Sequence, residues 1–420
     1  MNLEILFDYI QEGFWDLGFV RKDYLKKLEI LDNANVVKVI TWIRRVWKSF
    51  ILKQFIDNLS KKGFKKENIF YLHLEDYRLG LNPDLKILWD IFDFYIKTIY
   101  QGWDFYVFLD EIQNVNWWEK FIRTINEKYW NQAHIFITWS NSNLLSTELS
   151  TLLTWRFVNL QVYPFSFKDF LKFKWYEINS KLDTNKVDYF QEYITFWALP
   201  EILKIEDENT KNNYILTLVD SILFKDIIAR YKLRKVNFIS ALLRYIYSTT
   251  CSFLSVNSIL KYLKQEIKTL DYETVDSYLT YLENSFLINK LQAISSKTKE
   301  ILKLNRKFYS YDLWIRNIYS NNYDIEKILE NYVYLELKRR WYELYVISDS
   351  DYEIDFFAKN KNEKIYFQVS YTLKDKKTYE REVKSLLKQK DNYRKIILTM
   401  DENEFEDRGI EVRNIINWSL

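Results

Sequence analysis

The feature that most constrains the fold is a regular alternation of short apolar runs with helical segments over the first 162 residues. Residues 36–41 form the clearest run, because their β-branched side chains are continuous, as in a strand buried on both faces. Strands that alternate with helices of roughly 10–15 residues predict a parallel sheet covered on both sides, with ligands at the carboxyl ends of the strands. We expect strands at residues 36–41, 68–74, 105–109, 134–138 and 157–162, and helices at residues 21–31, 48–61, 85–100, 118–127 and 143–153.

Three other patterns follow along the chain. Residues 166–235 are typical of helices only. Residues 236–310 predict helices at 238–247, from the N-cap residue Ser255 onward and at 272–283, then two short apolar segments around a basic loop, which is the winged-helix plan. Residues 311–420 predict a second α/β unit, with helices at 325–340 and 379–388 and strands at 344–347, 354–358, 365–370 and 395–398. We therefore expect an α/β protein with four domains, at residues 1–165, 166–235, 236–310 and 311–420.

The first strand leads directly into a segment with the spacing of a phosphate-binding loop. The pattern is G-x-x-x-x-G-K-[ST] between a strand and a helix, and here the Lys, the Ser and both flanking elements match, but Trp42 and Trp47 stand at the glycine positions. We expect Lys48 on the β- and γ-phosphates of ATP and the Ser49 hydroxyl on Mg²⁺, with backbone N–H groups around the phosphates. The predicted nucleotide-binding residues are Trp42, Ile43, Arg44, Arg45, Val46, Trp47, Lys48 and Ser49.

A second motif completes the predicted site. The apolar run Val107-Phe108-Leu109 ends in Asp110 and Glu111, as a Walker B strand requires: Asp110 would hold Mg²⁺ and Glu111 would polarise the attacking water. The strand that ends at Thr138 is followed by Ser140 and Asn141, and we expect Asn141 to sense the γ-phosphate. Arg156 is either a cation presented to a neighbouring subunit's nucleotide or a structural surface residue.

Composition excludes several classes of protein. The sequence holds no run of about 18 apolar residues, so we expect no membrane span. A single cysteine, Cys251, and an acidic start without a cleavage site predict a cytoplasmic protein. With only two histidines, His73 and His134, a His/Cys zinc site is not expected. The net charge of +3 argues neither for nor against nucleic acid.

Taken together, these segments resemble a family of prokaryotic AAA-type ATPases with a winged helix and a C-terminal restriction-nuclease-like domain of unknown function. The resemblance covers nearly the whole chain. It rests on VITWIRRVWKS (39–49), FLDEIQNVNWWEK (108–120), FITWSNSNLL (136–145), LLTWRF (152–157), YPFSFKDF (163–170), ALPEIL (198–203), LFKDIIARY (223–231) and YDLWIRN (311–317). It implies an ATP-hydrolysing enzyme that uses Mg²⁺.

Glycine is scarce, with 6 residues against 15 tryptophans. The family pattern has glycine where this chain has Trp42, Trp47, Trp117, Trp139, Trp155, Trp197, Trp314 and Trp341, whereas Trp118 looks like a family tryptophan. An indole at position 47 would occupy space that the β-phosphate needs. One hypothesis is that these positions are encoded by UGA. The organism would translate UGA as glycine, whereas the sequence was written with UGA read as tryptophan. The alternative is an ATPase relative that truly carries these tryptophans and has lost nucleotide binding.

The C-terminal half leaves further alternatives open. The loop at 295–307 carries Lys297, Lys299, Lys303, Arg306 and Lys307 against Glu300, which suits the phosphates of DNA. The presumed recognition helix is acidic, however, so DNA contact and protein docking both remain open. At restriction-nuclease spacings the chain has Glu330, Asp355, Gln368 and Ser370. An acid and a lysine of the metal-dependent chemistry are thus missing, and we expect an inactive scaffold, with an active nuclease as the alternative.

The sequence therefore predicts an ATP- and Mg²⁺-dependent ATPase with catalytic residues Lys48, Glu111, Asn141 and Arg156 and metal ligands Ser49 and Asp110. DNA, through the winged helix, and further copies of the chain are the candidate partners. The alternative function is a nucleotide-incompetent DNA-binding or scaffold protein.

Overall fold

The computed structural model describes residues 14, 16–41, 48–80, 83–140, 157–177, 185–196, 199, 201–233, 236–263, 270–295, 301–320, 323–349 and 351–420. The chain divides into two compact units, Met1–Tyr163 and Pro164–Leu420. Within the described ranges, no helix is both long and apolar enough to cross a membrane.

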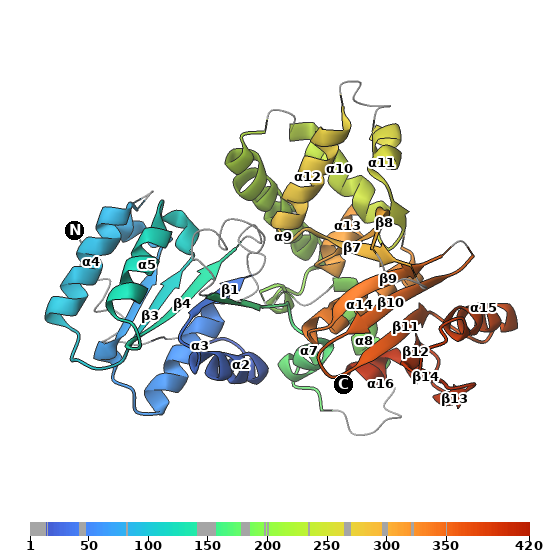
Figure 1. The fold of residues 1–420 in the computed structure, drawn as a ribbon, viewed down its shortest axis with the longest axis horizontal. Helices are drawn as coiled ribbons and strands as arrows, with labels where there is room; N and C mark the ends of the chain where they lie inside the picture. Colours follow the sequence, from blue (N-terminus) through green and yellow to red (C-terminus); the bar gives the residue numbers. More distant parts are fainter. Residues whose placement is uncertain are drawn as a thin grey trace. The chain divides into compact units, whose positions relative to one another are not determined.

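The first unit is built on a five-stranded parallel sheet (Figure 1). Its strands are β1 (Val37–Thr41), β2 (Ile69–His73), β3 (Phe105–Asp110), β4 (Ala133–Trp139) and β5 (Phe157–Gln161), in the order β2-β3-β4-β1-β5. Strands β1 and β3 are buried along their whole length, as their continuous apolar sequences predict. Because β1 lies between β4 and β5, and β4 between β1 and β3, the carboxyl ends of β1, β3 and β4 meet at one edge of the sheet.

Helices cover both faces of this sheet (Figure 1). On one face lie α4 (Leu85–Thr98) and α5 (Trp118–Lys128), whose apolar side chains share a core with alternate residues of β1 to β4. On the other face α3 (Lys48–Lys61) packs the Phe55 ring against Tyr106, Phe108 and Phe136 of the sheet. Helix α2 (Lys22–Asp32) packs beside α3. The predicted strands and helices of this unit are confirmed to within a few residues, and the predicted helix at 143–153 lies outside the described residues.

The second unit begins with helices, as predicted. These are α7 (Phe167–Phe173), α8 (Asn185–Phe196) and α9 (Glu208–Ser221), which continues into the π-helix η6 (Ile222–Ala229). Three helices follow, α10 (Val236–Ser248), α11 (Val256–Leu263) and α12 (Tyr272–Asn284), and Ser255 accepts a hydrogen bond from the backbone N–H of Ser258 at the start of α11. The antiparallel hairpin of β7 (Ile288–Ile294) and β8 (Ile301–Ser310) comes next, and the short β6 (Phe253–Leu254) pairs with β8.

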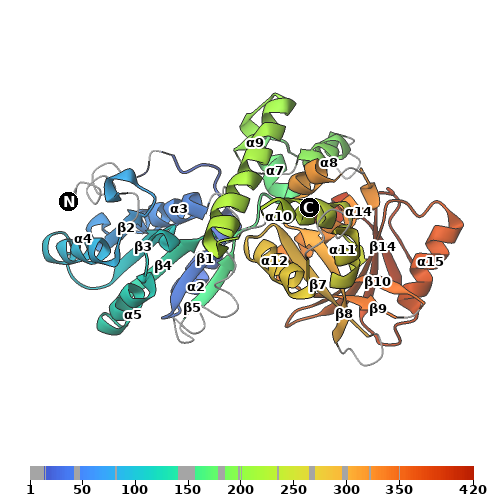
Figure 2. The ribbon, with the colours of Figure 1, turned by 90° about the horizontal axis from the view of Figure 1, so that it is seen from above.

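This hairpin is part of one nine-stranded sheet with the C-terminal strands (Figures 1 and 2). The strand order is β13-β14-β12-β11-β10-β9-β7-β8-β6, and β7 pairs in parallel with β9 through Ala293 and Ile294. Helix α13 (Leu313–Tyr319) and helix α14 (Ile325–Arg339) follow the hairpin. The remaining elements are β9 (Glu343–Ser348), β10 (Glu353–Lys359), β11 (Lys364–Ser370), α15 (Lys376–Leu387), β12 (Arg394–Thr399), β13 (Phe405–Asp407), β14 (Ile410–Asn414) and α16 (Ile415–Ser419).

The two faces of the C-terminal sheet carry different helices. Val383 and Leu386 of α15 share a core with Tyr366 of β11 and Ile397 of β12. On the opposite face, Tyr334 of α14 stacks on Tyr309 of β8. Sequence patterns predicted α14, α15 and β9 to β12, but they did not predict β6, β13, β14, α13 and α16.

Among the described residues, four tryptophans have backbone conformations that favour glycine. Trp103, Trp117, Trp175 and Trp341 have φ of 75°, 63°, 57° and 65°, in the left-handed region that costs an L-residue about 1–3 kcal/mol. Their indoles are 88%, 63%, 93% and 54% exposed. Trp341 follows α14, at the position where a helix commonly ends in a glycine.

Candidate functional site

Two of the predicted phosphate-binding residues, Lys48 and Ser49, lie at the amino end of α3. Lys48 is buried, and its Nζ lies 3.8 Å from Oε1 of Glu111. The amino end of a helix attracts anions, because its first N–H groups have no partner within the helix and the helix dipole is positive there. Trp42, Ile43, Arg44, Arg45, Val46 and Trp47 lie outside the described residues, so the loop itself stays a prediction.

Asp110 lies completely buried at the end of β3. The Thr138 hydroxyl of β4 donates a hydrogen bond to Oδ1 of Asp110, and the Ser49 side chain also bonds the carboxylate. Burial alone would raise the pKa of Asp110, but hydrogen bonds from His73, Ser49 and Thr138 outweigh it and hold the pKa below its ordinary value. The structure thus keeps Asp110 as a carboxylate anion beside the hydroxyl of Ser49, the other predicted metal ligand.

Glu111 has a left-handed backbone, with φ 58° and ψ 51°. Two side chains hold that backbone: the Glu111 N–H donates to the Thr138 hydroxyl at 2.7 Å, and the Asn114 amide donates to the Glu111 carbonyl at 3.0 Å. Such strain persists where the surroundings fix it, and it concentrates at functional sites. The Glu111 side chain is thereby turned toward Lys48.

His73 joins the site although no sequence motif indicated it. It ends β2, and its Cα is paired in register with Asp110 of the neighbouring strand. Its Nδ1 lies 3.3 Å from Oδ2 of Asp110. Burial lowers the pKa of His73, but the Asp110 carboxylate outweighs burial, so that the pKa is raised. The position of His73 follows from the strand order, which the alternation of strands and helices does not determine.

The structure therefore brings together Lys48, Ser49, Asp110, Glu111 and Thr138 from three elements. Asn141 and Arg156, the predicted sensor and finger, lie outside the described residues. Ser140, which precedes Asn141, is described and contacts Gln113. Lysine, hydroxyl and paired carboxylates at the carboxyl edge of a parallel sheet are the groups that a Mg²⁺–triphosphate requires.

Comparison with known proteins identifies the family. Residues 34–171 match the family model described as AAA domain. The chain is 31% identical over 405 residues to an uncharacterized protein of Haemophilus influenzae, covering 95% of this chain and 98% of that protein. An uncharacterized protein of Methanocaldococcus jannaschii is 32% identical over 449 residues, covering 100% and 96%.

This chain belongs to the same family as these two uncharacterized proteins, and it contains an AAA domain.

Residues 187–323 of this AAA protein match a second family model, a domain of unknown function. Among solved structures, the Walker-type ATPase of Pyrococcus abyssi shares 15% identity and covers 74% of this chain and 97% of its own, with a TM-score of 0.47. DnaA of Aquifex aeolicus bound to AMPPCP shares 15% identity, covers 66% of this chain and 91% of its own, and has a TM-score of 0.29.

A second lysine–carboxylate cluster lies in the C-terminal unit, at the predicted nuclease-like positions. Nζ of Lys307 on β8 lies 2.9 Å from Glu330 of α14 and 3.6 Å from Asp355 of β10, and it also contacts Glu353. Only 3% of the Lys307 side chain is exposed. The ammonium thus lies among three carboxylates. In the part of the chain that the structure describes, no group of three metal-ligating residues is arranged to hold one.

The other two nuclease-like positions have structural contacts. Oε1 of Gln368 accepts a hydrogen bond from the Asp355 N–H at 3.2 Å, and Ser370 donates to the Thr372 carbonyl at 3.2 Å. Asp355 in turn accepts from the Val369 N–H at 2.9 Å. These bonds tie β10 to β11 across the sheet. Lysine is missing from β11 at the expected position, and the lysine that the cluster does contain comes from β8.

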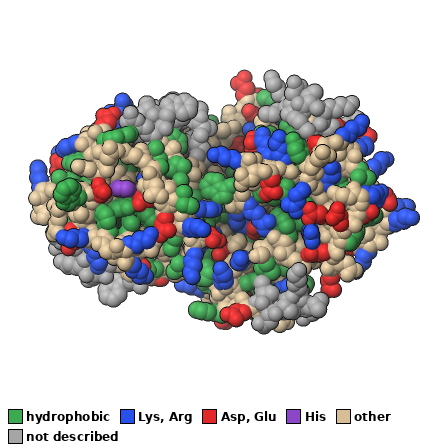
Figure 3. Space-filling view, turned by 60° about the horizontal axis from the view of Figure 1, so that its bottom comes forward, with side chains coloured by type: hydrophobic (Ala, Val, Ile, Leu, Met, Phe, Trp, Pro, Cys, Tyr) green, Lys and Arg blue, Asp and Glu red, His purple; other side chains and the backbone are tan. Residues whose placement is uncertain are grey.

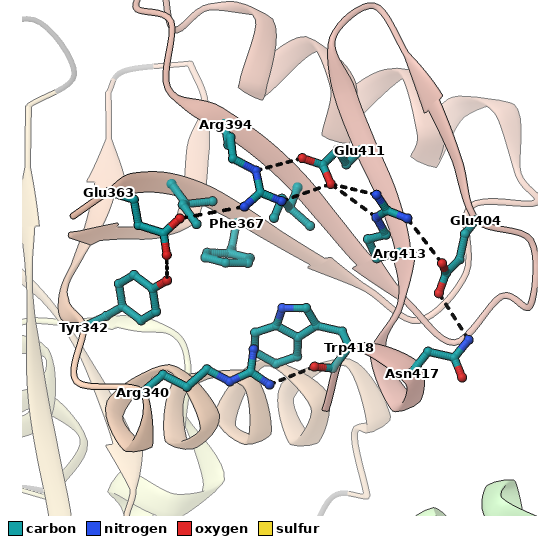
Figure 4. A pocket seen from close by; sticks show the side chains of 12 residues that line it. Arg340, Tyr342, Glu363, Phe367, Arg394, Glu404, Glu411, Arg413, Asn417 and Trp418 are labelled. Atoms are coloured by element: carbon teal, nitrogen blue, oxygen red, sulfur yellow. Dashed lines mark hydrogen bonds and ion pairs between the residues drawn. The ribbon is translucent and has the colours of Figure 1, made fainter. Parts of the chain in front are cut away.

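A cavity of about 480 Å³ lies elsewhere in the same unit (Figure 4). Phe367 and Trp418 lie in its floor and wall, and the Arg340 guanidinium stacks on the Trp418 ring at 3.9 Å. Arg394 and Arg413 both pair with Glu411, and Arg413 also reaches Glu404. The cavity is lined by three arginines and three glutamates, so its formal charge is 3 − 3 = 0. Arg394 and Arg413 are already paired with acids, and Arg340 donates to the Trp418 carbonyl, which makes the cavity a poor site for a triphosphate.

The basic loop of the hairpin retains less free charge than its sequence suggests. Arg306 bonds Asp276 of α12 at 3.0 Å, and Lys307 is buried in the acidic cluster. The other three lysines, Lys297, Lys299 and Lys303, lie where side chains are not described. On the face of the molecule seen in Figure 3, basic side chains lie among acidic ones instead of gathering in one patch.

Proposed function

We propose that this AAA protein binds ATP with Mg²⁺ at the carboxyl edge of its first sheet and hydrolyses it. The observation that carries the proposal is the convergence of Lys48, Asp110 and Glu111 there, with Ser49 and Thr138 bonded to Asp110. The residues fit the metal: Ser49 and Asp110 offer the hard oxygen ligands that Mg²⁺ prefers. Bound there, Mg²⁺ would neutralise charge on the phosphates.

Each side chain has a role in this reaction. The Lys48 ammonium would bind the β- and γ-phosphates, and Glu111 would accept a proton from the attacking water. Thr138 fixes Asp110 and the Glu111 backbone together, so that the two carboxylates keep their separation. We assign Asn141 as the γ-phosphate sensor and Arg156 as a cation for the nucleotide of a neighbouring copy, which would make the enzyme an oligomer.

The test is phosphate release by chain carrying glycine at positions 42 and 47. Lys48→Ala and Glu111→Gln should abolish turnover, and Lys61→Ala is the control, because Lys61 lies on the same helix but is exposed and pairs with Asp57. Unchanged turnover in either of the first two variants would refute the assignment.

We also infer that the tryptophans at the family's glycine positions are encoded by UGA, which the organism translates as glycine. Support comes from Trp117 and Trp341, whose backbones are left-handed. The same argument adds Trp103 and Trp175, which the family pattern did not indicate. For Trp139 and Trp314 the backbone gives no such support, since neither has a positive φ. Codons settle the question: UGG at positions 42 and 47 would contradict the inference, and UGA there would support it.

For the second unit we propose a winged helix formed by α10 to α12 and the β7–β8 hairpin, joined to an inactive nuclease-like fold. The three helices followed by a hairpin, with β6 pairing on β8, support the first part. Lys307 supports the second, because its ammonium occupies the space between the carboxylates that would bind metal. The salt dependence of DNA binding tests contact through Lys297, Lys299 and Lys303. If these lysines bind DNA phosphates, the salt dependence should vanish when all three are replaced.

A further inference from the structure

Gln113 lies two residues beyond Glu111, at a point where the proposed reaction requires a fixed carboxylate. Its side-chain Nε2 donates one hydrogen bond to Oε2 of Glu111 and another, of 2.9 Å, to Oγ of Ser140. A carboxylate oxygen can only accept, so the nitrogen end of the Gln113 amide must face Glu111. The amide therefore links the catalytic acid to the end of β4.

The two oxygens of Glu111 have different partners. Oε1 lies 3.8 Å from the Lys48 ammonium, and Oε2 is held by Gln113. In the proposed reaction the Lys48 ammonium is needed by the phosphates. The bond from Gln113 is then the contact that keeps the carboxylate in place while nucleotide is bound.

The backbone of Glu111 is secured separately. Thr138 accepts its N–H and Asn114 donates to its carbonyl. Replacement of Gln113 therefore leaves those bonds intact and removes only the restraint on the carboxyl group. This separation makes it possible to test the side chain's orientation without changing the strand ends.

Ser140 gives the link a second function. It follows the last residue of β4, Trp139, and precedes Asn141, the proposed γ-phosphate sensor. We propose that Gln113 is a positioning residue that orients the Glu111 carboxylate for the attacking water and, through Ser140, makes this orientation depend on the end of β4. The proposal rests on the ATPase function proposed above.

The experiment measures turnover and nucleotide affinity in chain with glycine at positions 42 and 47. Gln113→Met keeps the length of the side chain but removes the donor, and we expect kcat to fall by about 10- to 100-fold, since a misplaced catalytic group costs up to about 100-fold. KM for ATP and the melting temperature should stay unchanged. Gln101→Met is the control, because Gln101 is an exposed glutamine of the same unit.

Ser140→Ala tests the link to β4. It should lower kcat less than Gln113→Met does, and the double variant should be no slower than Gln113→Met alone, because the two residues act through one bond. If Gln113→Met does not fold, Gln113→Asn, whose amide is one methylene shorter, is judged by the same criteria.

The outcomes separate two failures. If the parent chain turns over ATP and Gln113→Met has the same kcat, the positioning role is refuted and the ATPase stands. A fall in ATP affinity together with the melting temperature would also refute it, because it would show a structural role. If the parent has no turnover, the ATPase proposal fails, and the inference fails with it.

Discussion

Two centres of this AAA protein contain the same residue types, a buried lysine and carboxylates, yet they differ in how the lysine is neutralised. In the first unit Lys48 lies 3.8 Å from one oxygen of Glu111, at the amino end of a helix. In the second, Lys307 lies within 4 Å of Glu330, Glu353 and Asp355. An ammonium with three carboxylate partners is already neutralised, whereas one at a helix start lies where anions bind. The same residue types therefore form a ligand site in one unit and a structural cluster in the other.

The largest effect is expected from removing the lysine of the closed cluster. Lys307→Met should lower the free energy of unfolding of the second unit by about 3–5 kcal/mol, because it leaves buried carboxylates without their cation. Urea unfolding of the full chain measures it. The control Lys61→Met, at an exposed lysine, should change stability by no more than about 0.5 kcal/mol. A loss of less than 1 kcal/mol would show that Lys307 is not the counterion of this cluster.

ATP turnover should depend on Lys48 and not on Lys307. We expect Lys48→Ala to reduce ATP turnover by about 10²–10³-fold, as for the loss of one electrostatic contact in a transition state. Lys307→Met should leave turnover per folded molecule unchanged, because Lys307 lies in the other centre. Phosphate release by the two variants measures this difference in turnover. An equal fall in both variants would contradict the prediction.

Nucleotide binding should stabilise one unit only. ATP with Mg²⁺ at 100 times its Kd should stabilise the first unit by about 2.7 kcal/mol, and this gain should persist in Glu111→Gln and vanish in Lys48→Ala. Thermal unfolding with and without nucleotide checks it. Asp355→Ala should retain the stabilisation, and the parent should not cleave DNA with Mg²⁺. Cleavage that Asp355→Ala abolishes would mean that the second centre binds metal after all.

A further effect concerns pH. Burial raises the pKa of Glu330 to about 8, and burial also raises the pKa of Glu353 and of Glu382. A carboxyl group whose pKa is higher in the folded state binds protons more tightly there than in the unfolded chain. Its contribution to the free energy of unfolding is therefore fully present below about pH 4.5 and is lost as pH rises toward 8. The second unit should therefore melt at a lower temperature at pH 8 than at pH 5, and Glu330→Gln should reduce this difference. Identical pH dependence in both proteins would exclude Glu330 as a source.

Sequence alone predicted the local structure around the first centre well. The motif residues Lys48, Asp110 and Glu111 are each adjacent to a strand or helix whose pattern is strong, so their positions followed from the order of elements. His73 and Gln113 could not be found in this way. His73 depends on β2 lying beside β3, and Gln113 has no periodic or motif signal, since its contact with Ser140 joins residues 27 apart.

The second centre was predicted only in part. Glu330 and Asp355 were identified by spacing, but Lys307 was counted as a surface base of the hairpin loop. Its burial depends on β8 lying next to α14 and on the hairpin joining the C-terminal sheet, and these are contacts between segments more than 20 residues apart. Local patterns carry no information on such pairing.

The parallel pairing of β7 with β9 has a consequence for dissection of the protein. Ala293 and Ile294 of β7 pair in register with Val346 and Ile347 of β9. A fragment that ends at residue 310 would therefore present β7 with no neighbouring strand on one side. Unpaired strand edges recruit strands from other molecules. Separately expressed halves of Pro164–Leu420 should therefore aggregate or exchange strands, and binding experiments on this unit need both halves in one polypeptide.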